Sequence, residues 1–564
     1  MNRRDFVKTA AGAILADTWT SRLSRAVVEA PADLVLWSGK VATVDREFSF
    51  AEAVAVRGDR IIAVGANRDA ERLIVPETRV IELDGRLVVP GFIDAHAHLE
   101  GYALSLLHLD LRDTRSFAEI AGMVSAEARK HAPGEWILGR SWDQNDWEAK
   151  DMPTHGVLTE AAPRNPVWLV RVDGHAGIAN RAAMERCGIT PRTISPEGGE
   201  ILRAPDGSPT GVFVDAAMHL IALHIPEPSP ERLAGAIAAA SDNCLAAGLT
   251  CVHDAGVSPE TIALYKRLID GDRLGIRVYA MLGDPGSGDA AAYFTANRVA
   301  GYANSRLEVR SVKLLMDGAL GSRGAALFEP YTDRPGYTGL LTTTPERALA
   351  VSRAALETGF QACIHAIGDR ANHLVLDAYE RALRARPASD HRFRIEHAQT
   401  VSPADIPRFA ALGVIPSMQP THATSDMPWA EARLGPERIK GSYAWRKFLD
   451  YGSIIPCGSD FPVESINPLL GFYAAVTRED LSGNPPGGWR PEECMTRVEA
   501  LRGFTAWAAY AAFQDSILGS IEPGKFADMV VLSRDILTIA PGGIPATVPD
   551  YTIVGGKVRY ERRT

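Results

Sequence analysis

The sequence predicts an α/β protein: a (β/α)8 TIM-like barrel with insertions, plus a small β-sandwich domain built from both ends of the chain. Between residues 91 and 517, short apolar runs alternate with alanine-rich helical stretches, which is typical of a parallel sheet covered by helices. Residues 33–90 and 518–564 instead show short strands separated by turn signals. The central region is much longer than the roughly 250 residues of a typical barrel, so insertions are expected.

The composition is that of an ordinary globular protein, with 46% hydrophobic and 23% charged residues in a chain of 564. A chain of this length can bury a large core and form more than one domain. The formal net charge is -9 and no basic stripe stands out, which argues against a nucleic-acid partner. No apolar run is long enough to cross a bilayer, so we expect no integral membrane segment.

Residues 1–32 are interpreted as an export signal and a linker. The stretch Asn2-Arg3-Arg4-Asp5-Phe6-Val7-Lys8 resembles the twin-arginine signal, and a mildly apolar segment over residues 9–16 follows it. This predicts passage through the twin-arginine export machinery and a periplasmic or secreted location. The alternative is a basic N-terminal arm without a targeting role.

The two ends of the chain have the same strand-like texture. Residues 33–36, 53–56 and 60–65 alternate in the manner of strands, and glycine-containing turns separate them. Residues 527–532 and 551–558 repeat this pattern near the C-terminus. We therefore predict that 33–90 and 518–564 form the first and second parts of one β-sandwich, with the barrel of residues 91–517 between them.

The barrel region contains continuous apolar runs, as buried parallel strands do. We predict strands at residues 166–172, 250–253, 311–315, 361–365, 393–397, 414–418 and 453–459. Helices are predicted at residues 117–131, 231–247, 345–358 and 373–385. The segment 140–230, which is rich in proline, glycine and tryptophan, is the predicted insertion.

Metal-ligand residues occur where the predicted strands end. His96 and His98 are two residues apart, so on a strand they share a face and could hold one ion. Lys313, His365, His397 and Asp460 each end a later strand-like segment. In a barrel these ends converge on one face, where the chemistry of such folds is located. So many polar groups would be costly to bury together without an ion, and two divalent metals would account for the set.

Lys313 needs a separate explanation, because a protonated ammonium repels cations. A desolvated lysine loses its proton readily, and the neutral amine can add CO₂ to give a carbamate that bridges two metals. The alternative for Lys313 is an ion pair with the substrate or within the structure. Alternatives also remain for the other residues: His96 and His98 could be ordinary surface or core histidines, His365 and His397 could be satisfied core histidines, and Asp460 could be a helix N-cap.

This set of residues resembles that of the amidohydrolase superfamily. The resemblance rests on the His-x-His after the first strand, the lysine, the two later histidines, the aspartate, and the segment Leu518-Gly519-Ser520-Ile521-Glu522-Pro523-Gly524-Lys525. Within the superfamily the chain is similar to the YtcJ-like branch, which includes N-substituted formamide deformylases. That closer similarity rests on Gly139-Arg140-Ser141-Trp142-Asp143, on Asp173-Gly174-His175 and on Asp317-Gly318-Ala319-Leu320-Gly321-Ser322-Arg323.

The resemblance implies a role for each residue. His96, His98 and Asp460 would hold one metal ion, His365 and His397 a second, and carbamylated Lys313 would bridge the two. Asp460 would also be the catalytic residue that takes a proton from the attacking hydroxide and passes it to the leaving nitrogen. Zinc is the expected metal, and iron, manganese or cobalt could occupy the same ligands. Asp173, His175 and Trp142 are predicted to contact the substrate, with loop packing as the alternative.

The implied activity is metal-dependent hydrolysis of a non-peptide amide-type C–N bond in a small molecule of the N-formyl or N-acyl amine class. A deaminase or a cyclic-amide hydrolase would use the same site. A non-catalytic secreted binding or regulatory protein is a further alternative, although every expected ligand type is present. A serine hydrolase is disfavoured, because no Gly-x-Ser-x-Gly lies at a strand–helix turn. A homodimer is left open.

Overall fold

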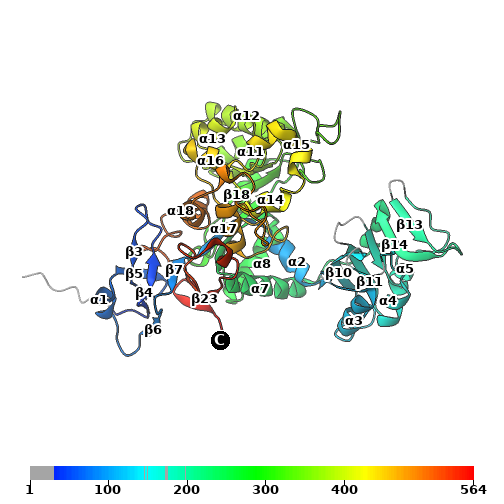
Figure 1. Ribbon diagram of the computed structural model, residues 1–564, viewed down its shortest axis with the longest axis horizontal. Coiled ribbons are helices and arrows are strands. Elements are labelled where there is room, and N and C mark those ends of the chain that lie inside the picture. The colour runs from blue at the N-terminus through cyan, green and yellow to red at the C-terminus, as the bar shows by residue number, and fades with distance from the viewer. Residues whose placement is uncertain are drawn as a thin grey trace, which may run out of the picture.

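The computed structural model describes residues 31–563, except residues 113, 145–146, 149, 172–175 and 197–198. Nearly all of the predicted export signal and linker, residues 1–32, therefore lies outside the described part of the chain. Figure 1 shows three parts: a central barrel, a β domain on one side that contains β4 to β7, and a separate unit on the other side that contains β10 to β14.

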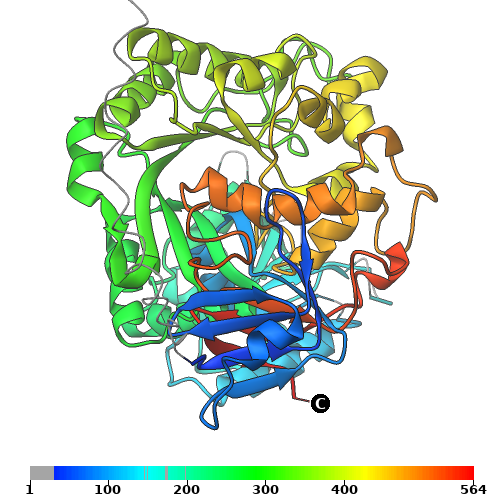
Figure 2. The ribbon, with the colours of Figure 1, turned by 90° about the vertical axis from the view of Figure 1, so that its left-hand side faces the viewer.

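The β domain contains strands from both ends of the chain. Its first sheet has the order β5-β4-β1-β6 and its second the order β24-β23-β22-β7-β2-β3. The bounds are β1 (Leu34–Trp37), β2 (Lys40–Ala42), β3 (Phe50–Ala51), β4 (Ala53–Arg57), β5 (Arg60–Gly65), β6 (Arg79–Glu82), β7 (Leu87–Pro90), β22 (Met529–Leu532), β23 (Pro549–Val554) and β24 (Lys557–Glu561). Strands from the two ends lie side by side in Figure 2, in blue and red.

The junction of the two ends is the antiparallel pair β7 and β22, in which Val89 lies opposite Val530 and Val88 opposite Val531. Val88 and Val531 belong to the core between the two sheets, whereas Val89 and Val530 pack into the core of the barrel region. The second sheet is thus buried on both faces, which explains why these strands are apolar at every position. The prediction that both ends share one β domain is confirmed.

The barrel sheet is parallel and has the order β8-β15-β16-β18-β19-β20-β21. Its bounds are β8 (Phe92–Ala97), β15 (Leu249–Val257), β16 (Arg277–Gly283), β18 (Leu307–Leu315), β19 (Gln361–Ala366), β20 (Arg394–His397) and β21 (Ile415–Ser417). Each predicted strand between residues 250 and 418 is therefore part of the barrel. Helices α7 (Pro230–Ala246), α8 (Pro259–Asp270), α11 (Pro345–Thr358) and α12 (Asp369–Ala385) alternate with these strands, and all but α8 were predicted from the sequence.

An extended segment at residues 455–460 closes the barrel between β21 and β8. Met418 N donates to Pro456 O at 3.0 Å on one side, and Ala95 N donates to Cys457 O at 3.0 Å on the other. Gly458 permits this approach, because a Cβ at that position would lie 2.5 Å from the backbone nitrogen of His96. The segment therefore takes the place of the eighth strand predicted at 453–459.

The helices begin at capping residues that the sequence supplies. The Ser229 hydroxyl accepts from Arg232 N at 3.2 Å, and the Thr344 hydroxyl accepts from Arg347 N at 3.2 Å. Proline follows each cap, where its missing N–H costs no hydrogen bond. Among the described helices, none has both the length and the hydropathy that a membrane span requires.

An inserted unit separates the first barrel strand from the second. It lies between α2 (Leu99–Leu106) and α7, and its sheet has the order β13-β14-β12-β11-β10-β9. Its elements include β9 (Leu109–Asp110), α3 (Phe117–Ala128), β10 (Ile137–Trp142), α4 (Gly156–Ala161), β11 (Val167–Arg171), β12 (Ala176–Ala179), α5 (Arg181–Arg186), β13 (Gly199–Arg203) and β14 (Pro209–Asp215).

Two details of the prediction are wrong here. The helix predicted at 117–131 does form, but it belongs to the inserted unit and not to the barrel, whereas the strand predicted at 166–172 forms within the predicted insertion. The insertion also begins well before residue 140, since β9 already pairs with β10. Local patterning specifies the type of an element, whereas the sheet that it joins depends on contacts with distant strands.

Candidate metal centre

The carboxyl ends of the barrel strands bring the predicted ligands together. His96 lies on β8 and His98 directly follows it; Lys313 lies on β18, His365 on β19, His397 on β20, and Asp460 on the closing segment. Ligand atoms of His96, His397 and Asp460 all lie within 4.8 Å of one another, and all three residues are buried. This arrangement follows from the parallel order of the sheet, which places all strand ends on one face.

The remaining predicted ligands adjoin these three. His98 Nε2 lies 3.1 Å from Asp460 Oδ1, and Lys313 Nζ lies 3.0 Å from His96 Nε2. The rings of His365 and His397 have their centroids 4.5 Å apart. The structure thus gathers into one cluster all six residues that the sequence assigned to metal binding.

The backbone at two of these residues is unusual. His397 has φ 73° and Asp460 has φ 62°, and both values fall in the left-handed region that non-glycine residues seldom occupy. Such conformations persist where the surrounding structure enforces them, and they are concentrated at functional sites. At His397 the turn directs two consecutive side chains, those of Glu396 and His397, toward the same histidine, His96.

The donor set fits a divalent cation. His365 Nε2 and Asp460 Oδ1 are buried and make no hydrogen bond to a described residue. Burial, followed by the nearby Lys313 charge, lowers the pKa of His96 to about 4 and that of His365 to about 3. The imidazoles are therefore neutral near pH 7, as metal ligands must be. Neutral imidazoles and a carboxylate around one point are the ligand types that zinc and related metals bind.

The sequence profile of the amidohydrolase family matches residues 79–560, which is most of the chain. This chain belongs to the amidohydrolase family.

Relatives of this amidohydrolase are similar over nearly their whole length. Protein LONG AFTER FAR-RED 3 of Arabidopsis thaliana is 36% identical, over 94% of this chain and 92% of its own. The putative amidohydrolase YtcJ of Bacillus subtilis is 31% identical over 93% of this chain and 99% of its own. The N-substituted formamide deformylase of Arthrobacter pascens is 31% identical over 94% of this chain and 98% of its own. The predicted YtcJ-like branch is thereby confirmed.

A solved structure agrees with this assignment. An uncharacterized metal-dependent hydrolase from Pyrococcus horikoshii has a TM-score of 0.74 and 26% identity, and the match covers 90% of this chain and 99% of that one. The family, the ligand cluster and this similarity together make the chain a metal-dependent hydrolase of C–N bonds.

Glu396 of this amidohydrolase, which was not predicted as a site residue, is fully buried beside the cluster. Its Oε2 accepts from His96 Nδ1 at 2.5 Å, and its Oε1 lies 2.7 Å from Arg394 Nε. Burial alone would raise the pKa of Glu396, but the Arg394 charge and His96 outweigh it and hold that pKa below its usual value. The ionised carboxylate fixes the proton on His96 Nδ1, which leaves the Nε2 lone pair directed into the cluster. The sequence feature that could have revealed Glu396 is its spacing from Arg394. The two residues are two positions apart, so both side chains lie on one face of the strand that ends at His397.

Two further residues adjoin the centre. Asp317 accepts backbone hydrogen bonds from Ala326 at 2.8 Å and from Gly368 at 2.8 Å, and it thereby joins the loop after β18 to the turn after β19. Burial raises the pKa of Asp317 to about 7 in spite of these bonds. His422, on α14 (Pro420–Asp426), stacks on His397 with centroids 5.9 Å apart and places Nε2 3.8 Å from Asp460 Oδ2.

Of the three predicted substrate residues, the structure describes Trp142, which does not lie at the centre. Trp142 is fully buried in the core of the inserted unit, where it stacks on Trp147 and its indole N–H donates to Leu169 O at 3.0 Å. Trp142 therefore packs against its neighbours in the inserted unit, which was the alternative to substrate contact. Asp173 and His175 lie outside the described residues, so their predicted role stays a prediction.

Proposed function

We propose that this amidohydrolase hydrolyses the amide bond of N-formyl or N-acyl amines with the help of two divalent metal ions, zinc being the expected metal. The observation that carries this proposal is the convergence of four histidines, Lys313 and Asp460 on the carboxyl face of the barrel. The formamide deformylase from Arthrobacter pascens, which is 31% identical over 98% of its own length, supports the substrate class.

The ligands divide into two sets in this proposal. His96, His98 and Asp460 would hold one ion, and His365 and His397 the other. A carbamate on Lys313, formed when its neutral amine adds CO₂ and releases a proton, would bridge them. Support comes from the burial of Lys313, which lowers the pKa of its ammonium and favours the neutral amine. Iron, manganese or cobalt would fit the same donors.

When bound, the ions would supply Lewis acidity, which lowers the pKa of a water molecule and polarises the substrate carbonyl. Asp460 then serves as the proton carrier: it accepts a proton from the attacking water and donates it to the nitrogen that leaves. Burial would raise the pKa of Asp460, but its contact with His98 and the neighbouring imidazoles outweigh this and hold the pKa well below its usual value. The carboxylate is therefore ionised near pH 7, which is the form that a proton acceptor requires. Glu396 holds His96 in the tautomer that this site requires.

The test is a substrate screen of the full chain, with the metal content measured in parallel. N-formyl amines, N-acyl amines, cyclic amides and aminopurines are supplied to the protein before and after metal removal by a chelator. We expect release of amine from the first two classes, loss of activity after chelation and recovery with zinc. Asp460→Asn should lose nearly all turnover, whereas Asp206→Asn, which removes an exposed carboxylate of the inserted unit, should not. Turnover of ring amides or aminopurines alone would replace this proposal with the cyclic-amide hydrolase or deaminase alternative.

We also propose export to the periplasm or beyond through the twin-arginine machinery. The support is the pair Arg3 and Arg4 in its basic and apolar context. Whether the chain forms a homodimer is a separate question, which light scattering on the purified chain would answer.

A further inference from the structure

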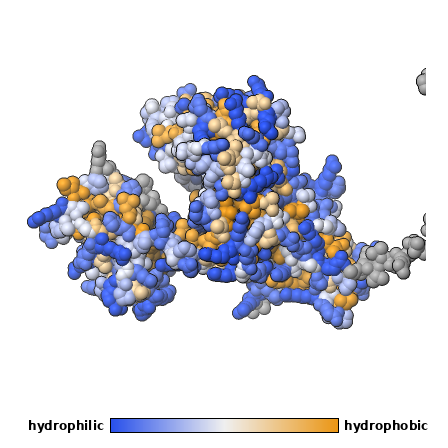
Figure 3. Space-filling model, turned by 180° about the vertical axis from the view of Figure 1, so that it is seen from behind, coloured by the Kyte–Doolittle hydropathy of each residue, from blue (hydrophilic) through white to orange (hydrophobic). Residues whose placement is uncertain are grey.

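A cleft lies between the barrel and the inserted unit, where the molecular surface is hollowed (Figure 3). Two cavities with volumes of about 650 Å³ and 480 Å³ form it. His108 and Arg140 line both cavities, so the cavities adjoin at these two residues.

The larger cavity lies against segments that carry metal ligands. One wall is the loop 462–466, which begins two residues after Asp460. Another wall includes Tyr102 and Ser105 of α2, the helix that begins directly after His98. The rings of Tyr102 and Phe461 pack together with centroids 5.5 Å apart and join these walls. The cleft therefore lies between the inserted unit and two segments that adjoin metal ligands in the chain.

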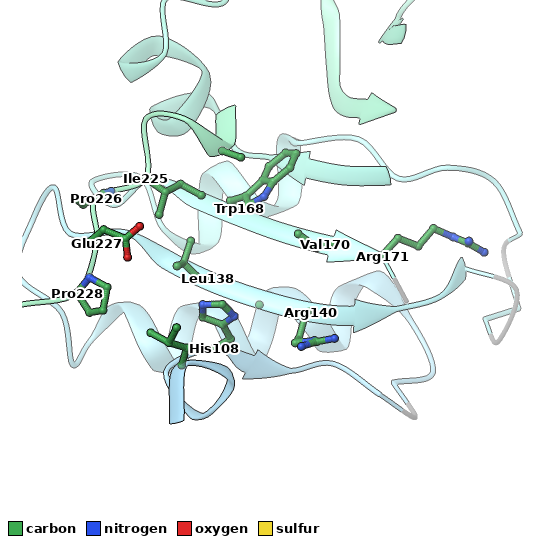
Figure 4. A pocket seen from close by; sticks show the side chains of 13 residues that line it. His108, Leu138, Arg140, Trp168, Val170, Arg171, Ile225, Pro226, Glu227 and Pro228 are labelled. Atoms are coloured by element: carbon green, nitrogen blue, oxygen red, sulfur yellow. The ribbon is translucent and has the colours of Figure 1, made fainter. Parts of the chain in front are cut away.

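The smaller cavity is mainly apolar. Its walls include Leu138, Trp168, Val170 and Ile225, and Figure 4 shows Leu138 and Trp168 facing the segment that carries Ile225 and Pro226. A concave apolar surface of this size suits a hydrocarbon chain or an aromatic ring, because burying such a group removes apolar area from water.

Arg140 supplies a positive charge where the cavities meet. Its exposed guanidinium makes no hydrogen bond or ion pair with any residue that the structure describes. Asp110 lies opposite Arg140 on the neighbouring strand, but the Arg112 guanidinium already binds that carboxylate at 2.9 and 3.0 Å. Figure 4 places Glu227 at the far end of the smaller cavity from Arg140, and Glu464 lines the larger one. Burial, and then the Arg140 charge, lowers the pKa of the His108 imidazole, so His108 adds no charge near pH 7.

We propose that this cleft binds the part of the substrate remote from the amide bond, and that Arg140 binds a carboxylate of that part. The inference rests on the proposed amide hydrolysis and narrows its substrate class to N-formyl or N-acyl amines with an apolar chain or ring that ends in a carboxylate. The planar guanidinium matches a carboxylate in a two-bond geometry, which a neutral ester lacks. Arg140 is thus a specificity residue supplied by the inserted unit to a reaction on the barrel.

Matched substrate pairs test this inference on the full chain. The pairs are N-formyl-para-aminomethylbenzoate and its methyl ester, and N-formyl-ω-aminohexanoate and its methyl ester. With the wild type, each carboxylate should have a lower KM than its ester. Arg140→Gln should raise KM for the carboxylates by about tenfold and leave KM for the esters unchanged, since a charge-assisted contact is lost only with the former. Arg140→Lys keeps the positive charge but loses the two-bond geometry. Its KM for the carboxylates should therefore lie between those of the wild type and Arg140→Gln.

Arg192→Gln is the matched control, because Arg192 is an exposed arginine of the same inserted unit that lines neither cavity. An Arg140→Gln variant that loses no more affinity for carboxylates than for esters would overturn the inference. Calorimetric binding of the same carboxylates separates this outcome from failure of the proposed function. If no compound is hydrolysed but the carboxylates bind wild type more tightly than Arg140→Gln, only the proposed hydrolysis fails. If wild type binds neither carboxylate, the inference itself is wrong.

Discussion

Glu396 should control both metal affinity and stability, and Glu396→Gln tests this. The substitution keeps the size and shape of the side chain but removes the negative charge that faces His96 and Arg394. An amide still accepts a hydrogen bond, but it polarises His96 less than a carboxylate does. Since carboxylate partners of ligating histidines typically contribute ~10- to 100-fold to metal affinity, we expect a loss of this size for zinc.

The stability effect follows from Arg394, whose side chain is fully buried. Without Glu396 its charge has no counter-charge in contact, and breaking a buried ion pair costs about 3 to 5 kcal/mol. Arg394 would keep its bonds to Ser417 Oγ at 2.8 Å and to His253 Nδ1 at 3.0 Å, so we expect the lower end of this range.

The assay is a zinc titration of metal-free protein against a competing chelator, with thermal unfolding of the same metal-free samples. Glu437→Gln is the control, because Glu437 is an exposed residue that pairs only with Lys440 among the described side chains. It should change unfolding by less than about 0.5 kcal/mol and zinc affinity not at all. If Glu396→Gln is destabilised but binds zinc as tightly as wild type, the role assigned to Glu396 in orienting His96 is refuted.

Three other predictions address the bridge, the domain junction and export. Lys313→Ala should lose most of its bound metal and far more kcat than KM, and short carboxylic acids should restore part of the activity; full metal occupancy would contradict the carbamate. Asp528→Ala should destabilise the chain by about 3 kcal/mol in thermal unfolding, because it leaves buried Arg277, now 2.7 Å from Asp528, without its counter-charge. Activity per folded molecule should be unchanged. If the Asp528→Ala variant unfolds at the same temperature as wild type, Asp528 does not stabilise Arg277 as stated. Replacing Arg3 and Arg4 with lysine should retain the precursor in the cytoplasm, and undiminished periplasmic delivery on fractionation would count against the signal.

The sequence was sufficient to predict the order of the main elements. Apolar runs at residues 250–253, 311–315 and 361–365 become β15, β18 and β19, and the helices predicted at 231–247 and 345–358 become α7 and α11, which begin after the capping residues Ser229 and Thr344. These predictions succeed because periodicity and capping depend on neighbours close in the chain. The six metal-binding candidates could also be predicted, since each ends a strand and parallel strands end on one face.

The tertiary structure decided which sheet each element joins and what surrounds each ligand. Residues 167–171 have the apolar pattern of a buried parallel strand, and they pair as β11 within the inserted unit and not in the barrel, because strand pairing depends on partners far away in the chain. Trp142 belongs to a conspicuous motif, but its surroundings make it a core residue. Glu396 and His422 act on ligands that are distant in sequence, and Arg140 reaches the cleft only because the inserted unit lies beside α2. Local sequence specifies the side chains and the element that carries each one, whereas burial, charge pairing and the walls of a cavity arise only when segments hundreds of residues apart come into contact.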